Sequence, residues 1–436
     1  MRIAHLLRKY NPAEWGGTET VIHQLFEGLR RHGADSIVYC PRLVTKGPNG
    51  HGRGHANGQA NGQNVRDPLA DAGCLVKRFN ACVPIWGISD EQRRQMIAVG
   101  GNLMSFDLLQ SLWTAPRLTV IHAHALGRVG GIGLTVARRR KIPFVVTVHG
   151  GVYDLPDGLK KTLNAPQSRG IEWGKPFGLL LGARRVLEEA DAILTCNRRE
   201  AELIQKKHPD RRVIVQPHGV PANVYETDHR AAARAAFPAI AGREVLLSVG
   251  RIDPVKNQGW LVEQVPALLQ RHPRALLVLA GACTDEAYGA ALEQRIDALG
   301  LRRHVLLTGK LPPADARLIG LMQLARVAIL QSISETFGLV ILEAWATGTP
   351  AISSRTSGAS ALIEPGETGW LFDLHRPEEF QAAVDTVLTQ PAAVRRVVTN
   401  SRARVIADYD TRVLAGRLKS LYEQLGEERH ALCHSA

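Results

Sequence analysis

The sequence predicts an α/β protein built of two successive doubly wound domains. Short runs of aliphatic and β-branched residues alternate with amphipathic helical patterns along nearly the whole chain. Such alternation is typical of parallel sheets covered by helices on both faces. The 436 residues also exceed the size of one ordinary domain. A stretch rich in proline and glycine at 216–221 separates an earlier group of candidate strands from a later one.

The candidate strands define the two domains. The earlier group comprises Arg2–Leu7, Ser36–Cys40, Thr119–Ala123, Phe144–Val148, Ala192–Thr195 and Arg212–Gln216. The later group comprises Val245–Val249, Ala275–Ala280, His304–Thr308, Val327–Leu330 and Ala351–Ser353. We therefore expect an N-terminal domain over residues 1–216 and a C-terminal domain over 217–410, with a C-terminal helix at 411–436 that joins the N-terminal domain.

Two segments of the first half depart from this alternation. Residues 47–64 are rich in Gly, Asn, Gln and His and offer almost no apolar side chain to bury, so we expect a disordered surface loop. Residues 74–113 return to an apolar periodicity of helical type, and we expect a helical insertion packed on the N-terminal domain.

Composition and cysteine spacing limit the protein class. No run of about 18 apolar residues lacks charges, so no spanning helix is predicted, and the basic N-terminus reads as a strand instead of a signal peptide. The six cysteines form no C-x-x-C pair, which argues against a disulfide framework or a zinc site. A cytoplasmic protein, at most peripheral to the inner membrane face, is the resulting expectation.

The positive charge lies entirely in the first half of the chain. Residues 1–212 hold 31 Lys and Arg against 18 Asp and Glu, whereas residues 213–436 hold 23 of each, which leaves the net +13 on the first part. Solubility alone, an anionic membrane surface and a phosphorylated acceptor all remain compatible with this charge. Nucleic acid is disfavoured as a partner because the chain has no zinc finger, stacking-aromatic motif or continuous basic helix.

Two motifs of the N-terminal domain carry candidate site residues. Gly16 and Gly17 follow the first strand, where a tight turn into a helix would present backbone N–H groups to an anion; an ordinary strand–turn–helix is the alternative. His149 ends a predicted strand, at the edge where open α/β sheets bind ligands, although its ring could equally be satisfied by backbone groups. The nearby pair His122 and His124 lacks the further ligands that a metal site would need.

The C-terminal domain carries a candidate diphosphate loop. Gly250 ends an apolar strand, and Arg251 and Lys256 follow it on the same loop. Arginine grips phosphate oxygens in a bidentate manner and lysine supplies a compact charge, so the pair could bind a diphosphate and offset its charge as it leaves. A solvated pair of loop cations is the alternative.

The strongest motif of the C-terminal domain is an E-x7-E stretch between Glu335 and Glu343. Ser334 or Thr336 is a plausible N-cap for a helix that begins near Phe337. Glu335 would then lie in the loop above the sheet. Glu343 would lie about 9 Å further along the helix axis, with apolar neighbours that make an unpartnered carboxylate unfavourable. The amides of Phe337, Gly338 and Leu339 would face a phosphate at the helix N-terminus.

Together these motifs resemble glycosyltransferase family 4, the retaining nucleotide-sugar transferases with the two-domain GT-B fold. The resemblance covers nearly the whole chain except about residues 47–113. The stretch 215–220 is also similar to the family's interdomain segment, with His218 where asparagine is usual. The loop at 356–363 departs from the family, since only Gly358 remains of a usual glycine pair and Ala361 occupies the expected glutamate position.

The resemblance implies a role for each motif. Glu343 is expected to contact the donor ribose and Glu335 the transferred sugar, while Arg251 and Lys256 bind the diphosphate. His149 is expected near the sugar carbon under attack, and the backbone at Gly17 near the phosphates. No metal or other cofactor is expected.

The resemblance also implies the partners. We expect a UDP- or GDP-sugar as donor and a saccharide or lipid-linked saccharide as acceptor, in the synthesis of cell-surface polysaccharide or glycolipid. The alternatives are an inactive protein of the same fold that binds a nucleotide sugar or glycan, and a nucleotide-sugar epimerase.

Overall fold

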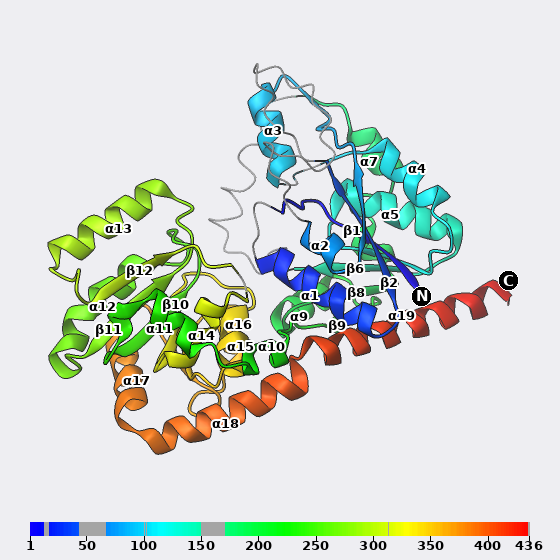
Figure 1. Cartoon of the computed structure of the whole chain (residues 1–436). Helices are drawn as coiled ribbons and strands as arrows, with labels where there is room; N and C mark the ends of the chain where they lie inside the picture. Colours follow the sequence, from blue (N-terminus) through cyan, green and yellow to red (C-terminus); the bar gives the residue numbers. More distant parts are fainter. Residues whose placement is uncertain are drawn as a thin grey trace. The chain divides into compact units, whose positions relative to one another are not determined.

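The structure is a computed structural model that describes residues 1–12, 17–42, 67–99, 101, 103–149, 171–312 and 314–434. The loop predicted at 47–64 and Gly16 lie outside these residues. The chain divides into two compact units, each of which is described by itself (Figure 1). Unit 1 comprises Met1–Pro217 and Leu414–Ala436, and unit 2 comprises His218–Val413.

Unit 1 is built on a seven-stranded sheet in which every strand pair is parallel, with the order β3-β2-β1-β5-β6-β8-β9. The strands are β1 (Arg2–Leu6), β2 (Asp35–Pro41), β3 (Leu75–Phe79), β5 (Val120–Ala123), β6 (Phe144–Val148), β8 (Ala192–Thr195) and β9 (Val213–Val215). A separate antiparallel pair joins β4 (Ile85–Trp86) to β7 (Ile171–Glu172).

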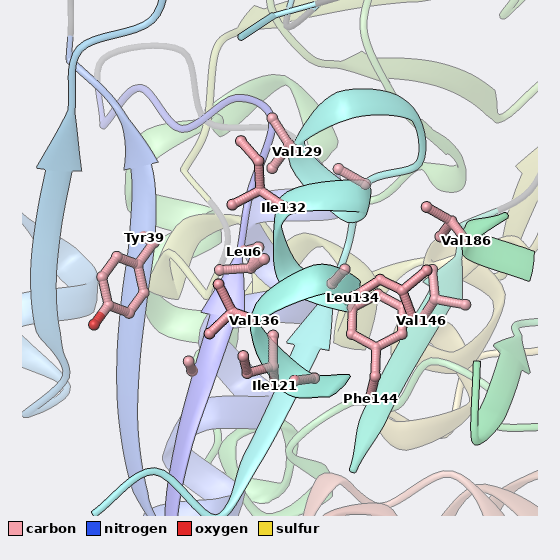
Figure 2. Close-up of a cluster of buried hydrophobic side chains, with 14 of the residues drawn as sticks. Leu6, Tyr39, Ile121, Val129, Ile132, Leu134, Val136, Phe144, Val146 and Val186 are labelled. Atoms are coloured by element: carbon pink, nitrogen blue, oxygen red, sulfur yellow. The ribbon is translucent and has the colours of Figure 1, made fainter. Parts of the chain in front are cut away.

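Helices cover both faces of this sheet because successive side chains of each strand point to opposite sides. The helices are α1 (Gly17–Arg31), α2 (Pro68–Asp71), α3 (Asp90–Val99), α4 (Phe106–Thr114), α5 (Gly127–Arg140), α7 (Lys175–Leu180), α8 (Val186–Glu189), α9 (Arg198–Lys207) and α19 (Thr411–His434). On one face, α4, α5 and α8 bury a cluster in which Ile132 of α5 lies near Leu6, and Val136 of α5 near Ile121 (Figure 2). On the other face, α1 and α19 contribute Phe26 and Tyr422 to a second buried cluster.

Unit 2 repeats the plan with a six-stranded parallel sheet of order β12-β11-β10-β13-β14-β15. The strands are β10 (Glu244–Val249), β11 (Ala275–Ala280), β12 (Val305–Gly309), β13 (Val327–Leu330), β14 (Ala351–Ser354) and β15 (Trp370–Phe372). Its helices are α10 (Ala222–Glu226), α11 (Arg230–Ala236), α12 (Gln258–Arg271), α13 (Glu286–Ala298), α14 (Ala316–Leu324), α15 (Leu339–Ala346), α16 (Ser357–Leu362), α17 (Pro377–Thr389) and α18 (Pro391–Asp408). Helices α12, α13 and α17 pack into one buried cluster with the sheet.

The two doubly wound parallel sheets confirm the predicted fold class, and every strand predicted from the sequence forms. The helical insertion predicted at 74–113 is wrong in part, because Leu75–Phe79 is the edge strand β3, paired in parallel with β2. The charged residues Lys77 and Arg78 suit a strand at a sheet edge, where charge discourages further pairing. Within the described residues, the helices are too short or too polar for any of them to cross a lipid bilayer.

Candidate functional site in unit 2

Two loops of unit 2 meet at the carboxyl ends of the neighbouring strands β10 and β13. The first, residues 250–257, follows β10 and is called the β10 loop. The second, residues 331–338, follows β13 and is called the β13 loop. Ligands of open α/β sheets bind at this edge, so the topology brings together the residues that the sequence placed on separate motifs.

Hydrogen bonds tie the two loops to each other. The Gln331 side chain accepts from Ser248 Oγ at 3.0 Å and donates to the Lys256 carbonyl oxygen at 2.7 Å. The Ile333 amide donates to the Val255 carbonyl oxygen at 2.9 Å. Because Gln331 and Ser248 are buried, these bonds fix the β10 loop against the β13 loop.

The predicted site residues Lys256 and Glu335 form an ion pair, with 2.5 Å between Lys256 Nζ and Glu335 Oε2. Both side chains keep about a fifth of their surface exposed, at 23% and 21%. Arg251 is more open, with 62% of its side chain exposed, and pairs with Asp253 at 3.2 Å. The site thus presents two cations within six residues of chain, and each is paired with a carboxylate that a bound diphosphate could replace.

The turn from the β13 loop into α15 depends on two glycines. Gly338 occupies the N-cap position with φ +93°, a conformation that other residues rarely adopt. A Cβ on Gly358 would lie 2.4 Å from the Phe337 amide nitrogen, so the two backbones approach closely only because residue 358 is glycine. The Gly358 amide donates to the Glu335 carbonyl oxygen at 2.9 Å, and this bond holds the β13 loop against the N-terminus of α16.

The prediction that Ser334 or Thr336 caps this helix is wrong, although the helix does begin near Phe337, two residues further on. Helix α15 begins at Leu339, and no side chain caps it. The chain turns into the helix at Gly338, whose backbone is left-handed, two residues after the predicted cap Thr336. The predicted phosphate contacts of the amides at Phe337, Gly338 and Leu339 stay a prediction.

Glu343 lies on α15 among buried apolar residues that include Ile341, Leu342 and Trp345. It accepts a hydrogen bond from Tyr225 Oη at 3.1 Å, which supplies the partner that its apolar setting requires. Burial raises the pKa of Glu343 to about 7, while the bond from Tyr225 opposes this rise. Glu343 therefore changes charge near neutral pH in the ligand-free protein.

One further predicted residue of unit 2, Gly250, directly follows β10, and its amide donates to the Ala280 carbonyl oxygen at 2.9 Å. The other predicted residues belong to unit 1, where Gly17 is the first residue of α1. His149 follows β6, and its Nε2 lies 3.0 Å from His124 Nδ1. Burial, and secondly the charge of Arg8, lower the pKa of His149 to about 4, so the ring is neutral at pH 7.

Sequence reasoning missed three residues that the structure adds to these sites: Tyr225, Gln331 and His5. Tyr225 and Gln331 carry no local motif, and their roles appear only once distant segments pack together. His5 stands opposite His122 in the register of β1 and β5. Within the described ranges, His5, His122 and His124 also bring one ligand atom each within 4.8 Å of one another.

Two known protein families match the chain. Residues 16–246 match the family described as glycosyl transferase 4-like domain, and residues 230–404 match glycosyl transferases group 1. The first match alone spans more than half of the chain.

Curated relatives point the same way. The D-inositol 3-phosphate glycosyltransferase of Nocardia farcinica is 31% identical over 291 residues, 64% of this chain and 60% of the relative. The protein of the same name from Thermobispora bispora is 28% identical over 331 residues, 74% of both chains. This chain therefore spans about 60% of the length of the Nocardia farcinica relative.

Solved structures share the fold. The Anabaena protein HepE, solved in complex with UDP, superposes with a TM-score of 0.70 at 19% identity, over 97% of this chain and 100% of that one. Sucrose-phosphate synthase of Thermosynechococcus elongatus gives 0.67 at 22% identity, over 97% and 98%. The solved structures show that the chain has the GT-B fold, and the family match over more than half of its length shows that it belongs to glycosyltransferase family 4.

Proposed function

We propose that this chain is a retaining, metal-independent glycosyltransferase that moves a sugar from a nucleoside-diphosphate sugar to a saccharide or lipid-linked saccharide. The observation that carries the proposal is the Lys256–Glu335 ion pair beside the exposed Arg251, at the carboxyl ends of two neighbouring strands. Cations at such an edge can bind a diphosphate through strong charge-assisted hydrogen bonds, and a carboxylate beside them can accept hydrogen bonds from sugar hydroxyls.

Donor binding would rearrange this ion pair. The diphosphate draws Lys256 away from Glu335 and recruits Arg251, and Glu335 is then available to the hydroxyls of the transferred sugar. Glu343 accepts from the donor ribose, and the backbone of Gly250 and of residues 337–339 approaches the phosphates. The roles that the resemblance gives to His149, Gly16 and Gly17 complete the proposal.

The reaction then needs no covalent work from the protein. The bond between the anomeric carbon and the phosphate oxygen breaks, the acceptor oxygen takes its place on the same face, and the acceptor proton leaves with the diphosphate. Lys256 and Arg251 stabilise the negative charge that develops on the leaving group, which is the usual contribution of fixed cations to such steps.

The comparisons supply the first donor and acceptor to try. HepE was solved with UDP and with UDP-glucose, and relatives of this chain are named for D-inositol 3-phosphate. We propose a UDP-sugar as donor before a GDP-sugar, and a phosphorylated polyol or saccharide as acceptor. The excess of Lys and Arg in residues 1–212 favours a phosphorylated or lipid-linked acceptor in glycolipid or cell-surface polysaccharide synthesis.

An exposed apolar surface of unit 1 supports peripheral attachment at the cytoplasmic face of the membrane. Trp86, Phe106, Phe177, Leu179 and Leu180 are all exposed, and the rings of Phe106 and Phe177 stand 5.7 Å apart. Exposed aromatic rings suit the headgroup region of a bilayer, and the excess of Lys and Arg over residues 1–212 suits an anionic one. Sedimentation with phosphatidylglycerol vesicles should therefore exceed that with phosphatidylcholine vesicles, and the double change Leu179→Ser with Leu180→Ser should weaken it.

The function is tested first by thermal shift with UDP, GDP and ADP, with and without EDTA. A ligand at a hundred times its dissociation constant adds about 2.7 kcal/mol to the folded state. UDP alone should raise Tm, unaffected by EDTA, and UDP-sugar turnover should require an added acceptor. Binding without turnover would identify an inactive binder, acceptor-free conversion of the sugar would identify an epimerase, and loss of activity in EDTA would contradict metal independence.

A further inference from the structure

Polar side chains from three neighbouring strands of unit 1 gather on one face of the sheet. Side chains alternate along each strand, and the register pairs His5 with His122 and His122 with Val145. His5, His122, His124, Thr147 and His149 consequently point to the face covered by α1 and α19. His5, His122 and His124 are buried.

Three of these rings form an unbroken line of contacts at hydrogen-bond distance. His149 Nε2 lies 3.0 Å from His124 Nδ1, and His124 Nε2 lies 3.1 Å from His5 Nδ1. His5 Nε2 lies 3.4 Å from Ser36 Oγ, which ends the line. A neutral imidazole has one donor and one acceptor nitrogen, so all the protons in the line must point the same way. The tautomer of each ring therefore determines the tautomer of the next.

The surroundings keep the two end rings of this line, His5 and His149, neutral. Burial, and secondly the charge of His124, lower the pKa of His5 well below its usual value, and burial and Arg8 lower the pKa of His149 to about 4. The neighbouring His122 ring bonds to Tyr422 Oη and Thr147 Oγ1, both at 2.6 Å, and burial lowers its pKa as well. A proton added to any ring would face other imidazoles in a site of low polarity.

We propose that His5 and His124 are positioning residues for His149, which hold its ring in one orientation and fix which of its two nitrogens carries the proton. This rests on the proposed function, in which His149 contacts the transferred sugar. A hydrogen bond to that sugar has a defined direction only if the tautomer of His149 is defined. The line to His124, His5 and Ser36 supplies that definition without adding charge.

A metal ion is the competing explanation of the same cluster, since His5, His122 and His124 could each offer one ligand atom. Both nitrogens of each of these three rings already lie within hydrogen-bond distance of another polar group. A metal would have to replace one such contact on every ring. The hydrogen-bonded arrangement accounts for all six nitrogens, so we favour it.

Nitrogen NMR of protein labelled with ¹⁵N-histidine tests the line directly and needs no substrate. The rings of His5, His124 and His149 should each show the two separate shifts of one neutral tautomer, with N–N couplings across the two imidazole contacts. His124→Phe keeps an aromatic ring but removes both nitrogens, and should return His149 to averaged shifts. Unchanged His149 shifts in this variant would overturn the proposal, as would a stoichiometric metal whose removal by EDTA changes the ring signals.

The kinetic test separates positioning from folding. His124→Phe should lower kcat about 10- to 100-fold with little change in the KM for the donor, and His124→Gln, which keeps one donor and one acceptor, should recover part of the loss. The matched control is His122→Phe, buried in the same cluster but outside the line, which should lower Tm without altering the His149 shifts. Equal kinetic losses in His124→Phe and His124→Gln would overturn the proposal. If the wild type turns over no donor, the proposed function fails. The NMR experiment would still show whether His124 and His5 fix the tautomer of His149.

Discussion

The two units carry side chains of opposite character at the carboxyl ends of their central strands. In unit 1 the ends of β1, β5 and β6 carry imidazoles that burial keeps neutral. In unit 2 the ends of β10 and β13 lead to loops that carry a lysine, an arginine and a glutamate, partly exposed and already ion-paired. The same topology thus places neutral hydrogen-bonding groups at the strand ends of unit 1. At the strand ends of unit 2 it places charged groups whose ion pairs a ligand can replace.

This difference matches two tasks of a transferase. A leaving diphosphate develops charge and needs fixed cations, whereas sugar hydroxyls need donors and acceptors of defined direction. The comparison predicts that substitutions in unit 2 will lower activity mainly because they remove charge. Substitutions in unit 1 will lower it because they disturb the orientation of hydrogen-bonding groups.

The largest effect is expected from Lys256→Ala. Loss of this cation should lower kcat about 100- to 1000-fold, because the charge on the leaving diphosphate is no longer offset. Tm should change little, since both side chains of the broken ion pair remain partly exposed. Initial rates with the responding nucleotide sugar give the measurement. Arg295→Ala, which breaks an exposed pair with Glu263 in the same unit, is the control, and a Lys256→Ala enzyme of near-normal rate would refute the placement of the site.

A smaller loss is expected from Gly358→Ala, which tests the geometry of the β13 loop. The new Cβ would meet the Phe337 backbone, so the loop that carries Glu335 must move at a cost of about 1–3 kcal/mol. The nucleotide-induced thermal shift should shrink. Gly426→Ala places its Cβ where no heavy atom lies within 4 Å, and should leave that shift unchanged. Equal behaviour of the two variants would show that the close approach has no importance for binding.

Glu343→Gln should separate stability from binding. At pH 8 the partly buried carboxylate is charged, and an amide of the same shape removes the cost of that charge, so the variant should gain about 1–3 kcal/mol of stability. Nucleotide affinity should fall about 5- to 10-fold, because a neutral acceptor binds the ribose more weakly. Urea unfolding and nucleotide titration at pH 8 measure the two changes. Tyr225→Phe, which removes the hydrogen bond to Glu343, should lower stability instead, and a Glu343→Gln variant less stable than wild type would contradict the role of burial.

The sequence was sufficient for those features that depend on local pattern. Aliphatic runs predicted the central strands, and the spacing of Arg251, Lys256 and Glu335 predicted charged loops at strand ends. The edge strand β3 escaped prediction because Lys77 and Arg78 hide its alternation, and α15 starts late because Gly338 adopts a backbone angle that no capping pattern reports.

The contacts that complete each site could not be predicted. Tyr225 reaches Glu343 across 118 residues of chain, and His5 reaches His124 across 119. Such pairs depend on how strands and helices pack, for which a single sequence carries no local signal. From the sequence alone, a histidine within an apolar strand is equally consistent with a ligand-binding residue and with a core residue whose ring is hydrogen-bonded inside the protein.

The most gradual effect, and the smallest at any single pH step, is an opposite response of the stability of the two units to pH. Unfolded histidines bind protons near pH 6.5, whereas native His149 does so only near pH 4, so protons favour the unfolded state and the stability of unit 1 should fall as pH drops from 6.5 towards 4. Native Glu343 binds a proton near pH 7, against 4.5 when unfolded, so its contribution is present below pH 4.5 and is lost as pH rises through 7. Each slope should reach at most about 1.4 kcal/mol per pH unit for each group.

Urea titrations at pH 5 to 8, each read by a hydrogen-exchange pulse at one common pH, report the stability of the two units separately. Glu343→Gln should abolish the loss in unit 2 and leave unit 1 unchanged, and parallel slopes in the two units would mean that the neutral and charged strand ends do not differ as the structure indicates.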